Sequence, residues 1–157
     1  MSLITPDDLY LFNEGDHLDL YAKLGSHLTQ VDDEAGVYFA VWAPNAEAVS
    51  IVGDFNGWDR ASHPMNARAE SGIWERFIPD VAKGAIYKYH TRSRHSGYAV
   101  DKADPFAVHA ETPPKTGSVV WDLTYDWNDD SWMSERAARN ALSSPISVYE
   151  VHLGSWM

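Results

Sequence analysis

Two histidines and two aspartates in the central part of this 157-residue chain are its best candidates for metal binding or catalysis. His90 and His95 have a spacing that could serve a metal ion, but turn residues lie between them and we expect them to flank a hairpin tip without a metal. Asp101 and Asp104 suggest paired hydrolytic carboxylates, which must stand on opposite sides of the scissile bond. Nothing in the sequence places them so, and Asp104 before Pro105 is typical of a turn-capping residue.

Recognisable catalytic motifs are absent from the sequence. It contains no Gly-x-Ser-x-Gly elbow, no phosphate-binding glycine loop and no His-Glu-x-x-His pair. The chain has no cysteine, which excludes a thiol nucleophile, a disulfide framework and an all-cysteine zinc site, and which fits a reducing compartment. We therefore predict no catalytic residue, no metal and no cofactor within these residues.

The charge of the chain limits its partners. Lys and Arg number 12 against 23 Asp and Glu, so the net charge is 12 − 23 = −11. Nucleic acid and anionic membrane surfaces require clustered cations, so we expect neither as a partner. The first residues show no signal peptide, and no apolar stretch is long enough to cross a membrane. These features predict a cytoplasmic protein.

The most distinctive segment is Gly53–Asp59, read GDFNGWD. A predicted strand ends at Gly53, and Asn56-Gly57 is a tight-turn dipeptide with a left-handed preference. Trp58 therefore sits just beyond a turn. Trp58 either folds back on the core or stays exposed to bind a ligand, and the residues alone leave both open.

The elements that would hold this turn are mostly strands. Short runs rich in β-branched and aromatic residues, separated by Gly, Pro, Asn and Asp, predict strands at 37–42, 49–53, 73–78, 85–91, 97–100 and 117–121. Such short strands indicate an all-β antiparallel β-sandwich. Because Trp42, Trp74 and Trp121 lie in these strands, we expect them in the core, whereas Trp127 and Trp132 follow the last strand and could pack on a further domain.

The flanks differ from this pattern. Thr5 and Pro6 predict the start of one helix, and a second short helix is expected over 17–24. Near the other end, Ser134 is expected to cap a helix over 135–142. After Ser143-Ser144-Pro145, residues 146–154 read as a strand. This strand either begins another domain or forms an edge of the sandwich.

Four short motifs give the central region a resemblance. GDFNGW at 53–58, VWAPNA at 41–46, Tyr87-Lys88-Tyr89 and Asp104-Pro105-Phe106-Ala107 follow one another in this order. Together they resemble the family 48 carbohydrate-binding modules, which bind glycogen and starch. The resemblance covers residues from about 35 to 125 and implies an immunoglobulin-like sandwich.

The flanks narrow the resemblance. Residues 20–27 are similar to the segment preceding this module in bacterial 1,4-α-glucan (glycogen) branching enzymes, and residues 147–156 resemble the first strand of their family 13 catalytic barrel. The resemblance implies a helical lead-in at 1–34, the sandwich at 35–125, a linker with a short helix at 126–144, and a stump of a TIM-barrel at 145–157. It also implies that the catalytic carboxylates lie beyond this chain.

The resemblance further implies a site for α-1,4-glucan, such as glycogen or maltooligosaccharides. Trp58 matches the tryptophan that stacks on a glucose ring, with Asn56 in the same turn, and Lys88 matches the lysine that binds sugar hydroxyls. Tyr98 matches a second stacking position, where tryptophan is common. The catalytic barrel would be the other partner. Alternative interpretations are a module of a family 13 debranching enzyme or trehalohydrolase, or a spacer that docks the barrel without binding sugar.

Overall fold

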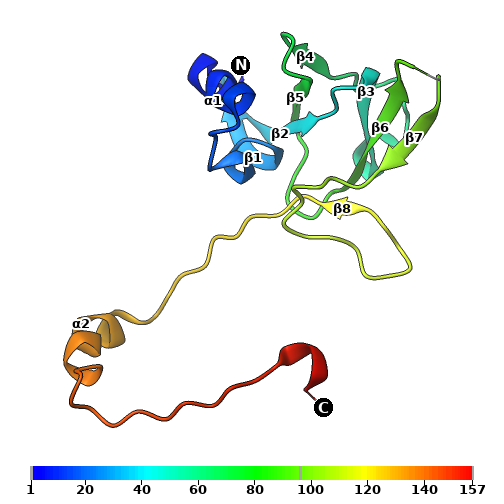
Figure 1. Ribbon diagram of the computed structural model, residues 1–157. Helices are drawn as coiled ribbons and strands as arrows, with labels where there is room; N and C mark the ends of the chain where they lie inside the picture. The colour runs from blue at the N-terminus through cyan, green and yellow to red at the C-terminus, as the bar shows by residue number, and fades with distance from the viewer. Residues whose placement is uncertain (1, 96, 157) are drawn as a thin grey trace. The chain divides into compact units, whose positions relative to one another are not determined.

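The computed structural model describes residues 2–95 and 97–156 and divides the chain into two compact units, Met1–Leu123 and Thr124–Met157. The first unit is built from two antiparallel sheets (Figure 1). One sheet has the order β1-β2-β5-β4, with bounds Gly25–Val31, Glu34–Trp42, Ile73–Pro79 and Asn66–Arg68. The other has the order β3-β6-β7, with bounds Ala46–Gly53, Ile86–Ser93 and Ala99–Lys102, and β8 (Ser118–Val119) also pairs with β6.

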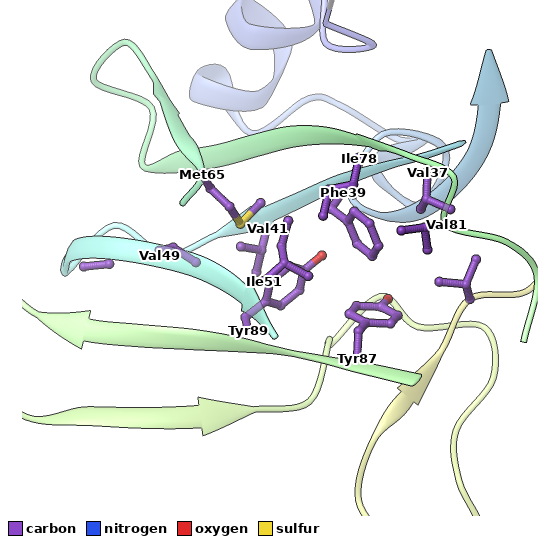
Figure 2. Packing of buried hydrophobic residues seen from close by; sticks show 12 residues of the cluster. Val37, Phe39, Val41, Val49, Ile51, Met65, Ile78, Val81, Tyr87 and Tyr89 are labelled. Atoms are coloured by element: carbon purple, nitrogen blue, oxygen red, sulfur yellow. The ribbon is translucent and has the colours of Figure 1, made fainter. Parts of the chain in front are cut away.

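The core lies between these two sheets (Figure 2). Val37, Phe39 and Val41 alternate along β2 and meet Tyr87 and Tyr89 from β6. Because side chains alternate between faces along a strand, Lys88 and the residues that pair with it must face the opposite side. The antiparallel β-sandwich predicted from the sequence is confirmed.

The other face of β2 is also covered. Tyr38 and Ala40 form a second buried cluster with Ile4 and Leu24, and Phe12 of helix α1 (Pro6–Glu14) packs against it. Burial on both faces explains why β2 reads as a continuous apolar run rather than an alternating one.

The expected helical lead-in at 1–34 needs correction. Residues 17–24 form only a single 3₁₀ turn, Leu20–Ala22, and residues 25–31 form strand β1, which pairs along its whole length with β2. Asp32 and Asp33 supply the left-handed residues of the β1–β2 hairpin, so the acidic run that follows β1 is a tight turn. The sequence pattern did not predict a strand over residues 25–31, because the polar residues His27 and Gln30 interrupt its apolar pattern.

Asp8 ties α1 to the sandwich. Its carboxylate accepts from the Thr5 amide at 2.8 Å and pairs with Lys23 Nζ at 2.9 Å and His17 Nε2 at 3.0 Å. Desolvation opposes ionisation of Asp8, but the hydrogen bonds from Lys23, Thr5 and His17 outweigh it and hold its pKa well below the usual range.

Because the pKa of Asp8 is lowered in the folded state, the free energy of unfolding depends on pH in the acidic range. A carboxylate whose pKa is lower in the folded state stabilises the fold above its unfolded pKa of 3.8 and loses that contribution as the pH falls further. We expect Asp8→Asn to lower stability at neutral pH, with the difference from wild type shrinking below about pH 4. Urea unfolding across about pH 2 to 7 measures this. Parallel profiles of stability against pH for wild type and Asp8→Asn would contradict this assignment.

Several strand and tryptophan predictions also change. The short strand β4 was not predicted, and the strand expected at 97–100 is displaced to Ala99–Lys102. Ser96, in the expected hairpin tip, lies outside the described residues.

The tryptophan predictions are only partly confirmed. Trp74 is half-buried against the core, but the exposed fractions of Trp42 and Trp121 are 54% and 39%, so these two are not core residues. Alternation alone mispredicted them because Trp42 is the last residue of β2 and Trp121 lies two residues beyond the end of β8.

The second unit contains helix α2 (Asp130–Arg139) and a 3₁₀ turn at Leu153–Ser155. The helix begins four residues earlier than Ser134, whose hydroxyl donates to the Ser131 carbonyl inside the helix instead of capping it. No strand forms over 146–154 among the described residues of this unit, because no neighbouring strand supplies hydrogen bonds. Trp127, with 74% of its surface exposed, and Trp132, with 46%, remain on the surface.

None of the helices described in the structure combines the length and apolar character that crossing a membrane would require.

Candidate functional site

The turn that follows β3 is organised by Asn56. Its side-chain amide donates to the Ile51 carbonyl at 2.9 Å and lies 2.8 Å from His63 Nδ1, while its side-chain carbonyl accepts from the Gly53 amide at 2.9 Å. Asn56 therefore closes the 3₁₀ turn Asp54–Asn56 onto the end of β3. Its amide is used inside the turn, so Asn56 positions the turn rather than presenting donors to a ligand.

Gly53 must be a glycine for this turn to form. A Cβ atom at this position would lie 2.5 Å from the Ile86 carbonyl oxygen and 2.5 Å from Phe55 Cε1. The Asp54 carboxylate accepts from the Ile86 amide at 3.2 Å, which attaches the turn to the start of β6. The local sequence therefore fixes where the next residues leave the sheet.

Trp58 leaves this turn in a strained conformation. Its φ angle is 63°, in the left-handed region that bulky residues rarely adopt and that costs about 1–2 kcal/mol. The Trp58 amide donates to the Gly53 carbonyl at 2.8 Å, and 43% of the residue surface is exposed. The structure thus fixes the backbone of a partly exposed tryptophan just beyond the turn.

Lys88 lies on the adjacent strand. It pairs with Val52 in the β3–β6 ladder and faces away from the core, since its neighbours Tyr87 and Tyr89 point into it. Lys88 Nζ donates to Thr116 Oγ1 at 2.7 Å. An ammonium has three donors, so Lys88 retains donors for a ligand. We call this side of β3, β6 and β7, opposite the core, the outer face.

Sequence reasoning missed a charged cluster on the outer face. Arg60, two residues after Trp58, makes a two-point contact with Asp101 of β7, at 2.8 Å from Nη2 and 3.2 Å from Nε. His90 Nδ1 lies 2.6 Å from the same carboxylate. The hydrogen bond from Arg60 is the main cause of the lowered pKa of Asp101. The cluster fastens the loop carrying Trp58 across β6 to β7, and no sequence motif indicates the Arg60–Asp101 pair.

Tyr98 lies on the opposite side of the sheet from Lys88. The Ser93 amide donates to its carbonyl at 2.8 Å, which continues the β6–β7 ladder and places Tyr98 on the same side as Thr91 and Val100. Lys88 and Asp101 project from the opposite side. Tyr98 lines a groove with Trp42, and 63% of its surface is exposed.

The two aspartates considered as a catalytic pair have different environments. Asp101 lies on the outer face, whereas Asp104 is buried and accepts from the hydroxyls of Tyr87 and Tyr89. Asp104 also accepts from the Phe106 amide at 2.8 Å, which confirms the predicted turn cap. Among the described residues, no three His, Cys, Asp or Glu side chains are placed to hold a metal ion.

Comparison with known proteins identifies the family. Residues 23–107 match the model of carbohydrate-binding module 48 (isoamylase N-terminal domain). The chain belongs to the carbohydrate-binding module 48 family. The match begins at residue 23, before strand β1, so the module includes β1, which the sequence analysis had assigned to the helical lead-in at 1–34.

Individual relatives are close over most of the chain. It is 57% identical over 151 residues to a 1,4-alpha-glucan branching enzyme GlgB of Synechococcus sp. (strain JA-2-3B'a(2-13)), and 54% identical over 150 residues to that of Albidiferax ferrireducens. These matches cover 96% and 95% of this chain but 20% and 24% of the relatives. The chain therefore spans about a fifth to a quarter of the length of the curated relatives it matches.

Solved structures agree with the module fold. The maltotriose complex of PulA from Klebsiella pneumoniae matches with a TM-score of 0.52 and 31% identity, over 64% of this chain and 11% of that one. A pullulanase from Paenibacillus barengoltzii matches with a TM-score of 0.52 at 20% identity, which supports the fold alone.

Proposed function

We propose that this module binds α-1,4-glucan chains on its outer face as the N-terminal part of a 1,4-α-glucan branching enzyme. The observation that carries the proposal is the strained, partly exposed Trp58 in the turn that follows β3, in a member of a carbohydrate-binding family; Lys88 lies on β6, the strand that pairs with β3. The branching assignment rests on relatives with 57% identity, against 31% for pullulanases.

The chemistry of the outer face suits a neutral polysaccharide. A glucose ring has an apolar face of C–H groups, which a flat indole covers, and a rim of hydroxyls, which an ammonium can bind. In this proposal Trp58 stacks on one ring and Lys88 donates to hydroxyls of the same chain. Such a ligand requires no charge complementarity, so a net charge of −11 does not oppose binding.

The role of Lys88 can be isolated with Lys88→Met, which keeps the apolar stem and removes the donors. We expect about tenfold weaker binding of maltoheptaose on the outer face, the loss of a hydrogen bond to a charged group. Isothermal titration with maltoheptaose gives the affinity. Lys83→Met, at a lysine paired with Asp122, serves as the matched control and should bind like wild type. If Lys88→Met binds maltoheptaose as tightly as Lys83→Met does, Lys88 does not contribute to the site.

The rest of the enzyme lies outside this chain in the proposal. Residues 126–144 would form a linker and 145–157 would begin a family 13 catalytic barrel, which would cleave an α-1,4 bond and rejoin the chain as an α-1,6 branch through a covalent intermediate. Glycogen is then the product, and the cytoplasm the expected location.

Iodine staining of amylose tests this assignment. The full-length protein that contains this segment should diminish the blue complex, and this chain alone should not. Release of reducing ends without branch formation would instead favour a debranching or trehalose-releasing hydrolase. If the full-length protein branches amylose normally but its isolated module does not bind maltoheptaose, the spacer alternative would be favoured.

A further inference from the structure

Arg60 spans the outer face from β3 to β7. The Ser50 hydroxyl of β3 donates to the Arg60 carbonyl at 2.7 Å, and the Arg60 guanidinium reaches Asp101 on β7. Ser50 pairs with His90 of β6, and His90 pairs with Asp101, so these three residues form one row across the sheet, which we call the cross-strand row. Two strand spacings, about 10 Å in total, separate its ends.

Lys88 lies between the cross-strand row and the turn that precedes Trp58. The Trp58 amide donates to the carbonyl of Gly53, the last residue of β3. Val52, one residue earlier, pairs with Lys88, and the cross-strand row lies two residues further along both strands. Because alternate residues of a strand face the same side, Lys88 and His90 are neighbours on the outer face. The turn, Lys88 and the cross-strand row therefore follow one another along the sheet.

The Arg60 guanidinium is oriented and still open to solvent. Its Nε and Nη2 donate to the two carboxylate oxygens of Asp101, and His90 Nδ1 lies 2.6 Å from one of them. The side chain of Arg60 is 62% exposed. A guanidinium has five N–H donors, two of which bind Asp101, and within the described part of the chain the other three have no partner. A planar group that is already oriented loses little entropy when it binds a further acceptor.

The contact between Arg60 and Asp101 has little to do for the fold. A single ion pair this exposed contributes little to folding stability, since water and salt screen it. A two-point contact that is shared with a third group nevertheless keeps its geometry. The pair therefore orients free donors on the outer face, at one end of the line that begins at the turn before Trp58.

We propose that Arg60 is a further binding residue of the outer face, which donates to hydroxyls of the bound glucan, and that Asp101 is its positioning residue. The choice of glucan as the ligand rests on the proposed function. Lys88 and Arg60 would then bind successive stretches of one chain. Since an ion pair orients one of the donors, the affinity for this neutral ligand depends on salt.

Isothermal titration of the 157-residue chain with maltoheptaose tests the proposal. Arg60→Met keeps the apolar stem without the donors and should bind about fivefold more weakly than wild type. Asp101→Asn keeps the size of the side chain without its charge and should bind about threefold more weakly. Arg139→Met is the matched control and should bind like wild type. Arg139 also donates through Nε and Nη2 to a carboxylate, that of Glu135, with 61% of its side chain exposed, but it lies in the second unit.

Two further measurements separate positioning from a structural role. Asp101→Asn should have no added effect in the Arg60→Met background, because Asp101 acts through Arg60. Between roughly 0.05 and 1 M NaCl, binding by wild type should weaken about twofold, whereas binding by Arg60→Met should not change. Melting temperatures of all variants should stay close to that of wild type.

The outcomes distinguish this proposal from the proposed function. If wild type does not bind maltoheptaose, the proposed function fails and the role of Arg60 fails with it. If wild type binds through Trp58 and Arg60→Met binds equally tightly, only the role of Arg60 is overturned. If Asp101→Asn weakens binding by the same factor with and without Arg60, Asp101 does not act through Arg60 and its positioning role is overturned.

Discussion

Replacing Asp104 with alanine is expected to lower the free energy of unfolding by about 3–5 kcal/mol. Only 6% of Asp104 is exposed, and its carboxylate accepts from Tyr87 Oη at 2.6 Å and Tyr89 Oη at 3.1 Å. Alanine would leave two buried phenol hydroxyls and the Phe106 amide without this acceptor, and each unsatisfied group costs about 1–3 kcal/mol. Burial of the Asp104 carboxyl raises its pKa.

Urea unfolding monitored by circular dichroism measures the Asp104 effect. Asp126→Ala, an exposed aspartate in the second unit, should change stability by less than about 0.5 kcal/mol. Tyr87→Phe removes one of the two donors and should cost less than Asp104→Ala. A loss below about 1 kcal/mol for Asp104→Ala would mean that water or a rearranged core replaces this acceptor.

Replacing Trp58 with alanine is expected to weaken maltoheptaose binding on the outer face at least about tenfold. The indole supplies the only aromatic surface that the proposal places on this face. Because Trp58 is partly exposed and an alanine can keep the hydrogen bond from its backbone amide to the Gly53 carbonyl, we expect little change in thermal stability. Intrinsic fluorescence and titration calorimetry give the affinity, and melting temperature checks the fold.

Trp127→Ala is the matched control for this prediction. It removes the same side chain from the second unit, where 74% of it is exposed, and should leave binding unchanged. Equal loss in both variants would point to nonspecific contact of the sugar with exposed tryptophan. An unchanged affinity in Trp58→Ala would exclude this residue from the site.

The sequence was a good guide wherever neighbouring residues alone determine the structure. The turn residues Asn56 and Gly57 predicted the sharp turn before Trp58, and alternation in β6 placed Lys88 on the face opposite Tyr87 and Tyr89. The cap of the Asp104 turn was equally local, since an aspartate before proline bonds an amide two residues later.

Features that depend on distant residues were not predictable. Strand β1 needs β2 beside it to be recognised as a strand, and the bond from Arg60 to Asp101 joins residues 41 positions apart. The side on which Tyr98 lies depends on the register of the β6–β7 hairpin, and a shift of one residue would reverse it. In the structure Tyr98 follows β6 in the expected hairpin and lies on the side of the sheet opposite Lys88.

The central claim is that Trp58 contacts an α-glucan chain, and the indole region of a nitrogen–proton correlation spectrum tests it most directly. The chain has seven tryptophans, and the Trp58 signal is assigned as the one missing from Trp58→Ala. The account predicts that this signal shifts saturably as maltoheptaose is added, and that cellohexaose of matched concentration leaves it in place. A Trp58 signal that stays unmoved at saturating maltoheptaose would contradict the account.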